Sequence, residues 1–146
     1  MALLLDTNVV SAARRPDRQD EAFRLFLRDY DIGEAFISSV TLMEIRFGIQ
    51  REEGRDPEFA RDLTRWLDKI VLPVFDGRVL DFSREAALAA GTLPTAQKRP
   101  TADAMIAATA LTHGLAVATC NVADFLPLGV QLVNPWTYSA TSNPIG

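Results

Sequence analysis

The chain has 146 residues, of which 48% are apolar and 23% are charged, and its net charge is −4. These values are typical of one globular domain, and no apolar run approaches the roughly 20 residues that cross a bilayer. A single cysteine excludes an internal disulfide. The single histidine, His113, is explained as a cation in the last turn of a helix that ends before Gly114. With one cysteine and one histidine, the chain lacks the parts of a catalytic triad, a Cys-His pair or a Cys/His zinc site. We therefore predict a cytoplasmic protein with no membrane segment and no signal peptide.

The first half of the chain alternates short apolar runs with segments of helical periodicity. A run without period-2 alternation suits a strand buried on both faces, and proline separates helices. The predicted elements are strands at Ala2–Leu5 and Ala35–Ser38 and helices at Asn8–Arg14, Asp20–Tyr30, Val40–Glu52 and Phe59–Leu67.

The second half continues the alternation. Pro73 restricts the apolar run Ile70–Phe75 to a short edge strand, and prolines and a glycine interrupt Gly91–Arg99. The remaining predicted elements are helices at Arg78–Ala90 and Thr101–His113 and strands at Leu115–Thr119 and Gly129–Val133. This order predicts an α/β fold, a three-layer α/β/α sandwich around a mostly parallel sheet. We expect one domain over residues 1–136 and a flexible tail over 137–146.

Four acids follow predicted strands or open helices at one edge of this sheet. Asp6 directly follows the first strand, Glu44 comes soon after the second, and Asp103 and Asp124 flank the strand Leu115–Thr119. Ligands of open α/β sheets bind beyond the carboxyl ends of the strands, so these acids can converge there. Each acid alone is explained as well by a helix cap or a turn, and Thr41 with Glu44 matches a capping box. It is less expected that four acids would all lie at the same edge of the sheet by accident, so together they favour a functional site.

Crowded carboxylates repel one another unless a cation joins them. Hard oxygen ligands select Mg²⁺ or Mn²⁺, which can activate a water molecule and neutralise charge on phosphate oxygens. An acidic site without histidine therefore predicts metal-assisted hydrolysis of a phosphodiester. The net negative charge is compatible with RNA, because the four clustered acids account for the excess of 19 acids over 15 bases.

Five blocks of the sequence, in this order and spacing, resemble PIN-domain proteins. The resemblance covers about residues 3–136 and is specifically to the VapC/FitB-type toxins of bacterial toxin–antitoxin pairs. The blocks are LLDTNVVS (Leu4–Ser11), ISSVTLMEIRFGI (Ile37–Ile49), TADAMIAATALTHGL (Thr101–Leu115), TCNVADF (Thr119–Phe125) and GVQLVNPW (Gly129–Trp136).

The resemblance implies a Mg²⁺- or Mn²⁺-dependent endoribonuclease with a PIN-like fold. Carried over by position, Asp6, Glu44, Asp103 and Asp124 fall on the catalytic and metal-binding acids of that family. Supporting polar positions fall on Thr119, Asn121 and Asn8, while Thr7 and Ser11 match the first block without an assigned role. The family usually has arginine where this chain has Cys120. The resemblance also implies a homodimer and a small DNA-binding antitoxin whose C-terminal tail occludes the site.

Several basic residues are close in sequence to these acids and are candidates for contact with RNA. Ordinary solvated surface charge explains any single one of them at least as well. The candidates are Arg14, Arg15, Arg18, Arg46, Arg51, Lys98 and Arg99, of which we select Arg14, Arg15, Arg46 and Arg99 as substrate-binding residues.

Three other functions share parts of this pattern. A haloacid-dehalogenase-type phosphatase needs a second aspartate two residues after the first, where this chain has Asn8. A receiver domain needs a lysine after a late strand, where this chain has Cys120 and Asn121. A PIN-like module that binds RNA or protein without catalysis stays open because of Cys120.

Overall fold

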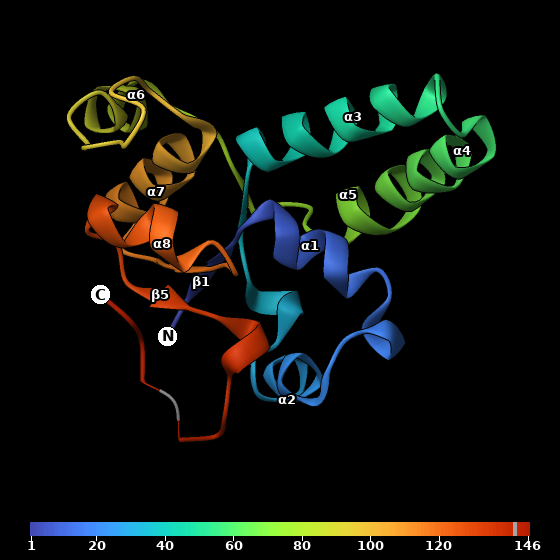
Figure 1. The fold of residues 1–146 in the computed structure, drawn as a ribbon, viewed down its shortest axis with the longest axis horizontal. Coiled ribbons are helices and arrows are strands. Elements are labelled where there is room, and N and C mark those ends of the chain that lie inside the picture. The colour runs from blue at the N-terminus through green and yellow to red at the C-terminus, as the bar shows by residue number, and fades with distance from the viewer. Residues whose placement is uncertain (142) are drawn as a thin grey trace.

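A computed structural model describes residues 1–141 and 143–146 of the chain as short strands enclosed by helices (Figure 1). The strands are β1 (Leu3–Leu5), β2 (Ile37–Ser38), β3 (Val79–Leu80), β4 (Ala116–Ala118) and β5 (Leu132–Val133). The α-helices are α1 (Thr7–Ala13), α2 (Glu21–Asp29), α3 (Ser39–Glu53), α4 (Pro57–Trp66), α5 (Leu72–Val74), α6 (Arg84–Ala90), α7 (Ala102–Thr112) and α8 (Val122–Phe125).

The strands pair in parallel throughout, as predicted. β4 lies between β1 and β5, and β2 pairs with β3. A parallel bridge between Leu4 and Phe36 joins the two groups, with the Phe36 N–H donating to the Leu3 carbonyl over 2.9 Å. The strand order is therefore β3-β2-β1-β4-β5, with the carboxyl ends of all five strands at one edge.

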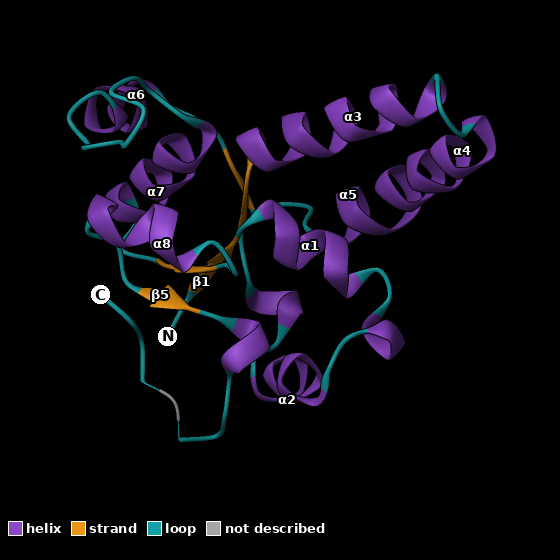
Figure 2. Cartoon of the chain, viewed as in Figure 1, coloured by secondary structure: helices purple, strands orange, loops and turns teal. Residues whose placement is uncertain are grey.

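Successive side chains of β1 point to opposite faces of the sheet, and the apolar core is accordingly divided into two clusters. Leu3 and Leu5 face a cluster that contains Phe23 from α2, whereas Leu4 faces a second cluster that contains Ile106 from α7. Figure 2 shows the strands between these two groups of helices. The three-layer α/β/α architecture predicted from the sequence is thereby confirmed.

Side-chain caps start the helices that follow the strands. The Asp6 carboxylate accepts from the Thr7 N–H at the start of α1, and the Ser38 hydroxyl accepts from the Val40 N–H at the start of α3. The Thr101 hydroxyl accepts from the Ala104 N–H at the start of α7. These starts lie near one another at the carboxyl edge of the sheet (Figure 1).

Two predicted elements are wrong. Ile70–Phe75 is not a strand: a π-helical turn (Leu67–Val71) continues α4 into α5, and Pro73 is the second residue of α5. The predicted helix over Arg78–Ala90 begins only at Arg84, because Ser83 caps it and Val79–Leu80 pairs with β2 as β3.

Flexibility of residues 137–146 stays a prediction. In the described part of that tail, the Tyr138 hydroxyl donates to Asp29 over 2.8 Å, and Ile145 forms an antiparallel bridge with Leu132. Among the helices of the described residues, none has the length and apolarity needed to span a membrane.

Candidate active site

Asp6 is the central acid of the site and lies at the carboxyl end of β1. Its side chain is only 2% exposed. One carboxylate oxygen accepts from the Thr7 N–H at 2.8 Å, and the other accepts from the Thr119 hydroxyl at 2.7 Å and the Asn8 amide at 2.9 Å. Burial raises the pKa of Asp6, and these hydrogen bonds oppose the rise. The bonds fix the orientation of the carboxylate.

Asn8 and Thr119 join the ends of β1 and β4. The Asn8 amide also donates to the Thr119 hydroxyl at 3.2 Å, and its carbonyl oxygen accepts from the Cys120 N–H at 3.2 Å. The Thr119 hydroxyl in turn accepts from the Asn121 N–H at 2.9 Å. The supporting positions Asn8 and Thr119 therefore contact Asp6 directly, whereas Asn121 contributes its backbone and has an exposed side chain.

Glu44 lies on the second turn of α3 and faces α1. Its carboxylate accepts from the Thr7 hydroxyl at 2.6 Å, and that hydroxyl is 3.1 Å from the hydroxyl of Thr41. Thr41 is fully buried and is not the helix cap, because Ser38 occupies that position. The short Thr7 contact couples Glu44 to the backbone segment that holds Asp6.

Asp103 and Asp124 complete the group from the other side of β1. Each is in the first turn of a helix, α7 and α8 respectively. The pKa of Asp103 is raised from 3.8 to about 6, first by burial and then by the charges of Asp6, Asp124 and Glu44. The four acids predicted from the sequence are thus electrostatically coupled. A small cavity of about 70 Å³ has Asp103 and Asp124 in its wall.

The chemistry of these side chains fits a hard divalent cation, although within the described ranges no three acid, thiol or imidazole groups are placed to hold one ion directly. Mg²⁺ keeps several water molecules and commonly binds through only one or two carboxylates. The mutual repulsion at Asp103 is the charge imbalance that such an ion would relieve.

Cys120 stands where the resembled family has arginine, on the exposed turn after β4. Burial and the charge of Asp6 raise the pKa of its thiol above 9.0, so the thiol is protonated at neutral pH. Cys120 therefore supplies no positive charge beside the acids and no thiolate nucleophile.

The four candidate substrate-binding arginines lie in different surroundings. Arg14 lies over the ring of Phe59 at 5.4 Å, and burial lowers its pKa. Arg46 pairs with Glu53 at 3.5 Å. Arg15 is exposed after α1, and Arg99 lies in the loop before α7, close in the chain to Asp103. Their contact with RNA stays a prediction.

Thr7 and Thr41 are the polar residues whose place in this site was missed by sequence reasoning. Thr7 belongs to the first resembling block and could have been selected for its position beside Asp6. Thr41 gave no such signal, because its spacing to Glu44 is equally that of a helix cap.

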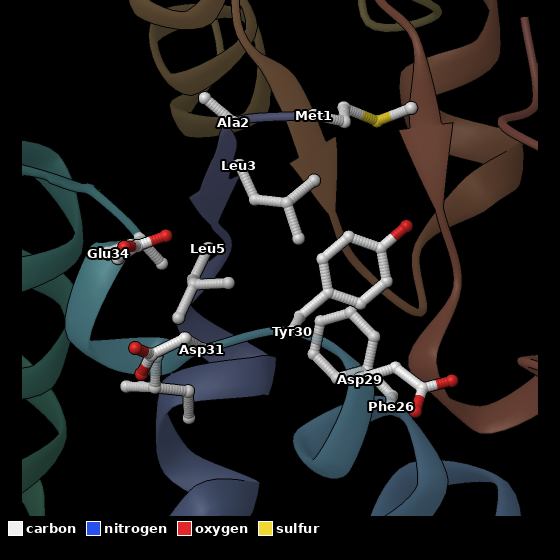
Figure 3. A pocket seen from close by; sticks show the side chains of 11 residues that line it. Met1, Ala2, Leu3, Leu5, Phe26, Asp29, Tyr30, Asp31 and Glu34 are labelled. Atoms are coloured by element: carbon white, nitrogen blue, oxygen red, sulfur yellow. The ribbon is translucent and has the colours of Figure 1, made fainter.

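A larger cavity of about 420 Å³ lies at the amino-terminal end of β1, away from the four acids (Figure 3). Phe26 and Tyr30 stand beside Leu3 and Leu5, and the exposed acids of the loop after α2 are at its margin. Parallel sheets bind their ligands at the opposite, carboxyl edge, so this cavity is not the candidate active site.

Residues 3–125 match the sequence family described as PIN domain. The chain is 31% identical over 140 residues to "Toxin FitB" of Neisseria gonorrhoeae, which covers 92% of this chain and 98% of that protein. It is 32% identical over 140 residues to "VapC ribonuclease Y4jK" of Sinorhizobium fredii, covering 92% and 97% respectively.

A solved structure with the same fold is that of FitAB bound to the IR36 DNA fragment. The TM-score is 0.80 at 29% sequence identity, and the match covers 97% of this chain and 100% of the other. The likeness extends over the whole sheet and both helical layers described above.

Proposed function

This chain belongs to the PIN domain family, and on that basis we propose that it is a Mg²⁺- or Mn²⁺-dependent endoribonuclease, the toxin of a toxin–antitoxin pair. The relatives named a toxin and a ribonuclease match nearly the full length of both chains, which supports the assignment. The observation that carries it is the group of four acids at the carboxyl edge of the sheet, where Asn8 and Thr119 orient Asp6 and Thr7 orients Glu44. Burial, and then the charges of the other three acids, raise the pKa of Asp103 to about 6, which agrees with this grouping.

Asp6, Asp103, Asp124 and Glu44 are the residues that would hold the cation, directly or through water. When bound, a divalent ion lowers the pKa of a water molecule and neutralises charge on the phosphate oxygens. In the reaction, water adds its oxygen to phosphorus and the bond to the leaving ribose oxygen breaks, giving a phosphate monoester and a hydroxyl. Two RNA ends result.

The protein's own contribution is the orientation of its carboxylates. Thr119 and Asn8 occupy one oxygen of Asp6, and the Thr7 N–H occupies the other, so the group cannot rotate. The Thr7 hydroxyl donates to one oxygen of Glu44 and so restrains this carboxylate as well. Fixed ligands lose little entropy when the cation and substrate bind.

The same contacts argue against a haloacid-dehalogenase-type phosphatase. Asn8 stands at the position where that enzyme needs an acid, and its amide uses both its donor and its acceptor on Asp6, Thr119 and Cys120. An amide does not titrate and cannot transfer a proton as a general acid.

We also propose a homodimer and an antitoxin partner. The similar FitAB structure was solved on DNA, which supports a small DNA-binding partner for this chain. An apolar cavity of about 130 Å³, lined by residues such as Val10, Trp66 and Ile70, lies beside α1 and offers a neighbouring groove for a partner's apolar side chains.

The test is cleavage of a mixed-sequence single-stranded RNA in Mn²⁺ by the purified chain. Asp6→Asn and Asp103→Asn keep side-chain shape and remove charge, so we expect both to abolish cleavage, as excess EDTA should. Binding of Mn²⁺ at about 100 times Kd should stabilise the chain by about 2.7 kcal/mol, read as a rise in Tm. Full activity of Asp6→Asn, or cleavage that persists in EDTA, contradicts the proposal.

A further inference from the structure

The loop between α6 and α7, residues 91–100, is closed by the side chain of Thr95. The Thr95 hydroxyl donates to the Arg99 carbonyl at 2.6 Å and accepts from the Arg99 N–H at 3.1 Å. The Lys98 N–H donates to the Thr95 carbonyl at 3.0 Å. Three bonds to one threonine hold this loop in a single turn.

Lys98 has a left-handed backbone, with φ of 55°, and among the described residues other than glycine no other has a positive φ. This conformation is unfavourable for a residue with a Cβ. Neighbouring contacts must compensate, and backbone strain of this kind gathers at functional sites. The strained residue here is an exposed cation at the tip of the turn.

The loop separates two hollows. One, of about 70 Å³, has Gln97, Asp103 and Asp124 in its wall. The other, of about 330 Å³, is lined by Lys98 and Arg99 together with apolar and hydroxyl side chains and no acid. Thr95 lies in the wall of both. A basic hollow therefore adjoins the acidic site through a shared wall.

An acidic active site repels the phosphates on either side of the bond that it cleaves. Cations outside the carboxylate cluster must supply the attraction. Arg14 and Arg46 are occupied by a ring and a carboxylate, whereas neither Lys98 nor Arg99 forms an ion pair within the part of the chain that the structure describes. Five residues span at most about 17 Å, so Lys98 lies within a few nucleotides of Asp103.

We propose that the loop of residues 91–100 binds the backbone of single-stranded RNA, with Lys98 and Arg99 on phosphates that flank the cleaved bond. The volume of the basic hollow is within the range of about 300–1,000 Å³ that small-ligand sites have. The inference rests on the proposed ribonuclease function and extends it to the substrate.

The test uses Lys98→Gly, which removes the cation and places glycine where the backbone already suits it. The probe is a fluorescein-labelled, mixed-sequence single-stranded RNA of 16 nucleotides, measured by anisotropy in EDTA with Asp6→Asn as the parent chain. We expect Lys98→Gly and Arg99→Gln to weaken binding about 3- to 10-fold in low salt, and each to reduce the slope of log affinity against log salt by about 0.7. Melting temperatures should stay within about 2 °C of the parent.

Two controls separate charge from structure. Lys69→Ala removes one exposed charge from the π-helical turn before α5 and should leave RNA affinity unchanged. Lys98→Arg keeps the charge and should retain affinity, even if Lys98→Gly proves unstable.

Equal affinities for Lys98→Gly and its parent would overturn the role of the loop, while RNA cleavage by the unaltered chain would still support the ribonuclease. Loss of affinity together with a change of mass in light scattering would also overturn it, because the loop would then be an interface between copies. A parent chain that binds no RNA overturns it as well. The proposed function fails separately, through absence of RNA cleavage by the unaltered chain in Mn²⁺.

Discussion

Asp6 serves local structure and the site at once. Its carboxylate caps α1, which is the ordinary role of an aspartate before a helix, yet it is also buried and bonded to Thr119 from a distant strand. A cap needs one hydrogen bond, and Asp6 accepts three. The additional donors stabilise the charged form of a carboxylate that burial would otherwise neutralise, which suits a group that is to hold a cation.

The hydroxyl of Thr7 is expected to orient Glu44. Thr7→Val keeps the shape and removes the 2.6 Å hydrogen bond, so kcat on RNA and Mn²⁺ affinity should fall about 10-fold or more. Titration calorimetry measures the affinity for Mn²⁺ independently of catalysis. Thr7→Ser retains the hydroxyl and is the matched control. Wild-type Mn²⁺ affinity in Thr7→Val would contradict an orienting role.

Asp103 should make the metal-free chain less stable as pH rises. Its pKa is 3.8 in ordinary surroundings and about 6 when folded. Below about pH 4 the group is protonated in both states. Between about pH 4 and 6 only the folded state keeps the proton, so the free energy of unfolding falls across this window and is constant above it.

Asp103→Asn should flatten that pH dependence and raise stability at pH 7. The pKa shift alone would correspond to about 3 kcal/mol, which solvent at a half-exposed carboxyl reduces to about 1 kcal/mol. Urea unfolding in EDTA at pH 4 and pH 7 measures it. A variant that is no more stable than the original chain at pH 7 would show that the acids do not repel one another as described.

The sequence predicted the positions of the acids, and the resemblance added Asn8 and Thr119, which donate hydrogen bonds to Asp6. It assigned no role to Thr7 or Thr41. Asp6, Glu44, Asp103 and Asp124 could be selected because each follows a predicted strand or opens a predicted helix at the carboxyl edge of the sheet. Thr41 could not, since its contact with Thr7 depends on how α1 packs against α3. Such tertiary contacts leave no periodic signal.

Among the elements, the segment after α4 shows where periodicity fails. The run IVLPVF is rich in β-branched residues, and a short apolar run of this kind fits a buried strand or a helical segment equally well. The segment is helical because it continues α4, and helical spacing buries Val71 and Phe75 together in the core. The strand instead forms four residues later, at Val79–Leu80, where β2 offers a partner.

Arg78 joins these elements. Its guanidinium donates to the carbonyls of Ile32, Ala35 and Val74 and lies over the ring of Phe75. We expect Arg78→Met to destabilise the chain by about 2–3 kcal/mol, because three carbonyls, two of them in partly buried contacts, lose a charged donor. Arg65→Met, which removes an exposed ion pair with Asp62, should cost less than about 0.5 kcal/mol in the same urea titration. Equal losses would contradict this role for Arg78.

Across the whole molecule, parallel strand order brings together residues that are far apart in the sequence. The pattern of alternating strands and helices predicted a parallel sheet, but the order β3-β2-β1-β4-β5 depends on which strands pair, which a single sequence does not specify. That order puts β1 at the centre, so the segment Asp6–Thr7 that follows it contacts residues from both sides. Thr119 follows β4 on one side, and α3 carrying Glu44 follows β2 on the other.

The same geometry suggests how a partner would inhibit the chain. A guanidinium can pair with two carboxylate oxygens at once, and the coupled acids around Asp103 attract such a cation. The partner's apolar side chains would occupy the groove beside α1, where Ile70 and Val74 are 53% and 40% exposed. We therefore predict that the antitoxin carries in its C-terminal half an arginine that reaches Asp6, Glu44, Asp103 or Asp124.

Because the apolar contacts remain, replacing that arginine should restore RNA cleavage in the complex while the complex itself persists. The measurement uses the partner that co-purifies with the chain from its native host, co-expressed with each basic residue of its tail replaced in turn. Ile70→Asp in this chain is the complementary variant, since a charge in the groove should weaken assembly and leave cleavage by the free chain intact. If no tail variant restores cleavage while the complex is retained, inhibition does not operate through an arginine in the acidic site.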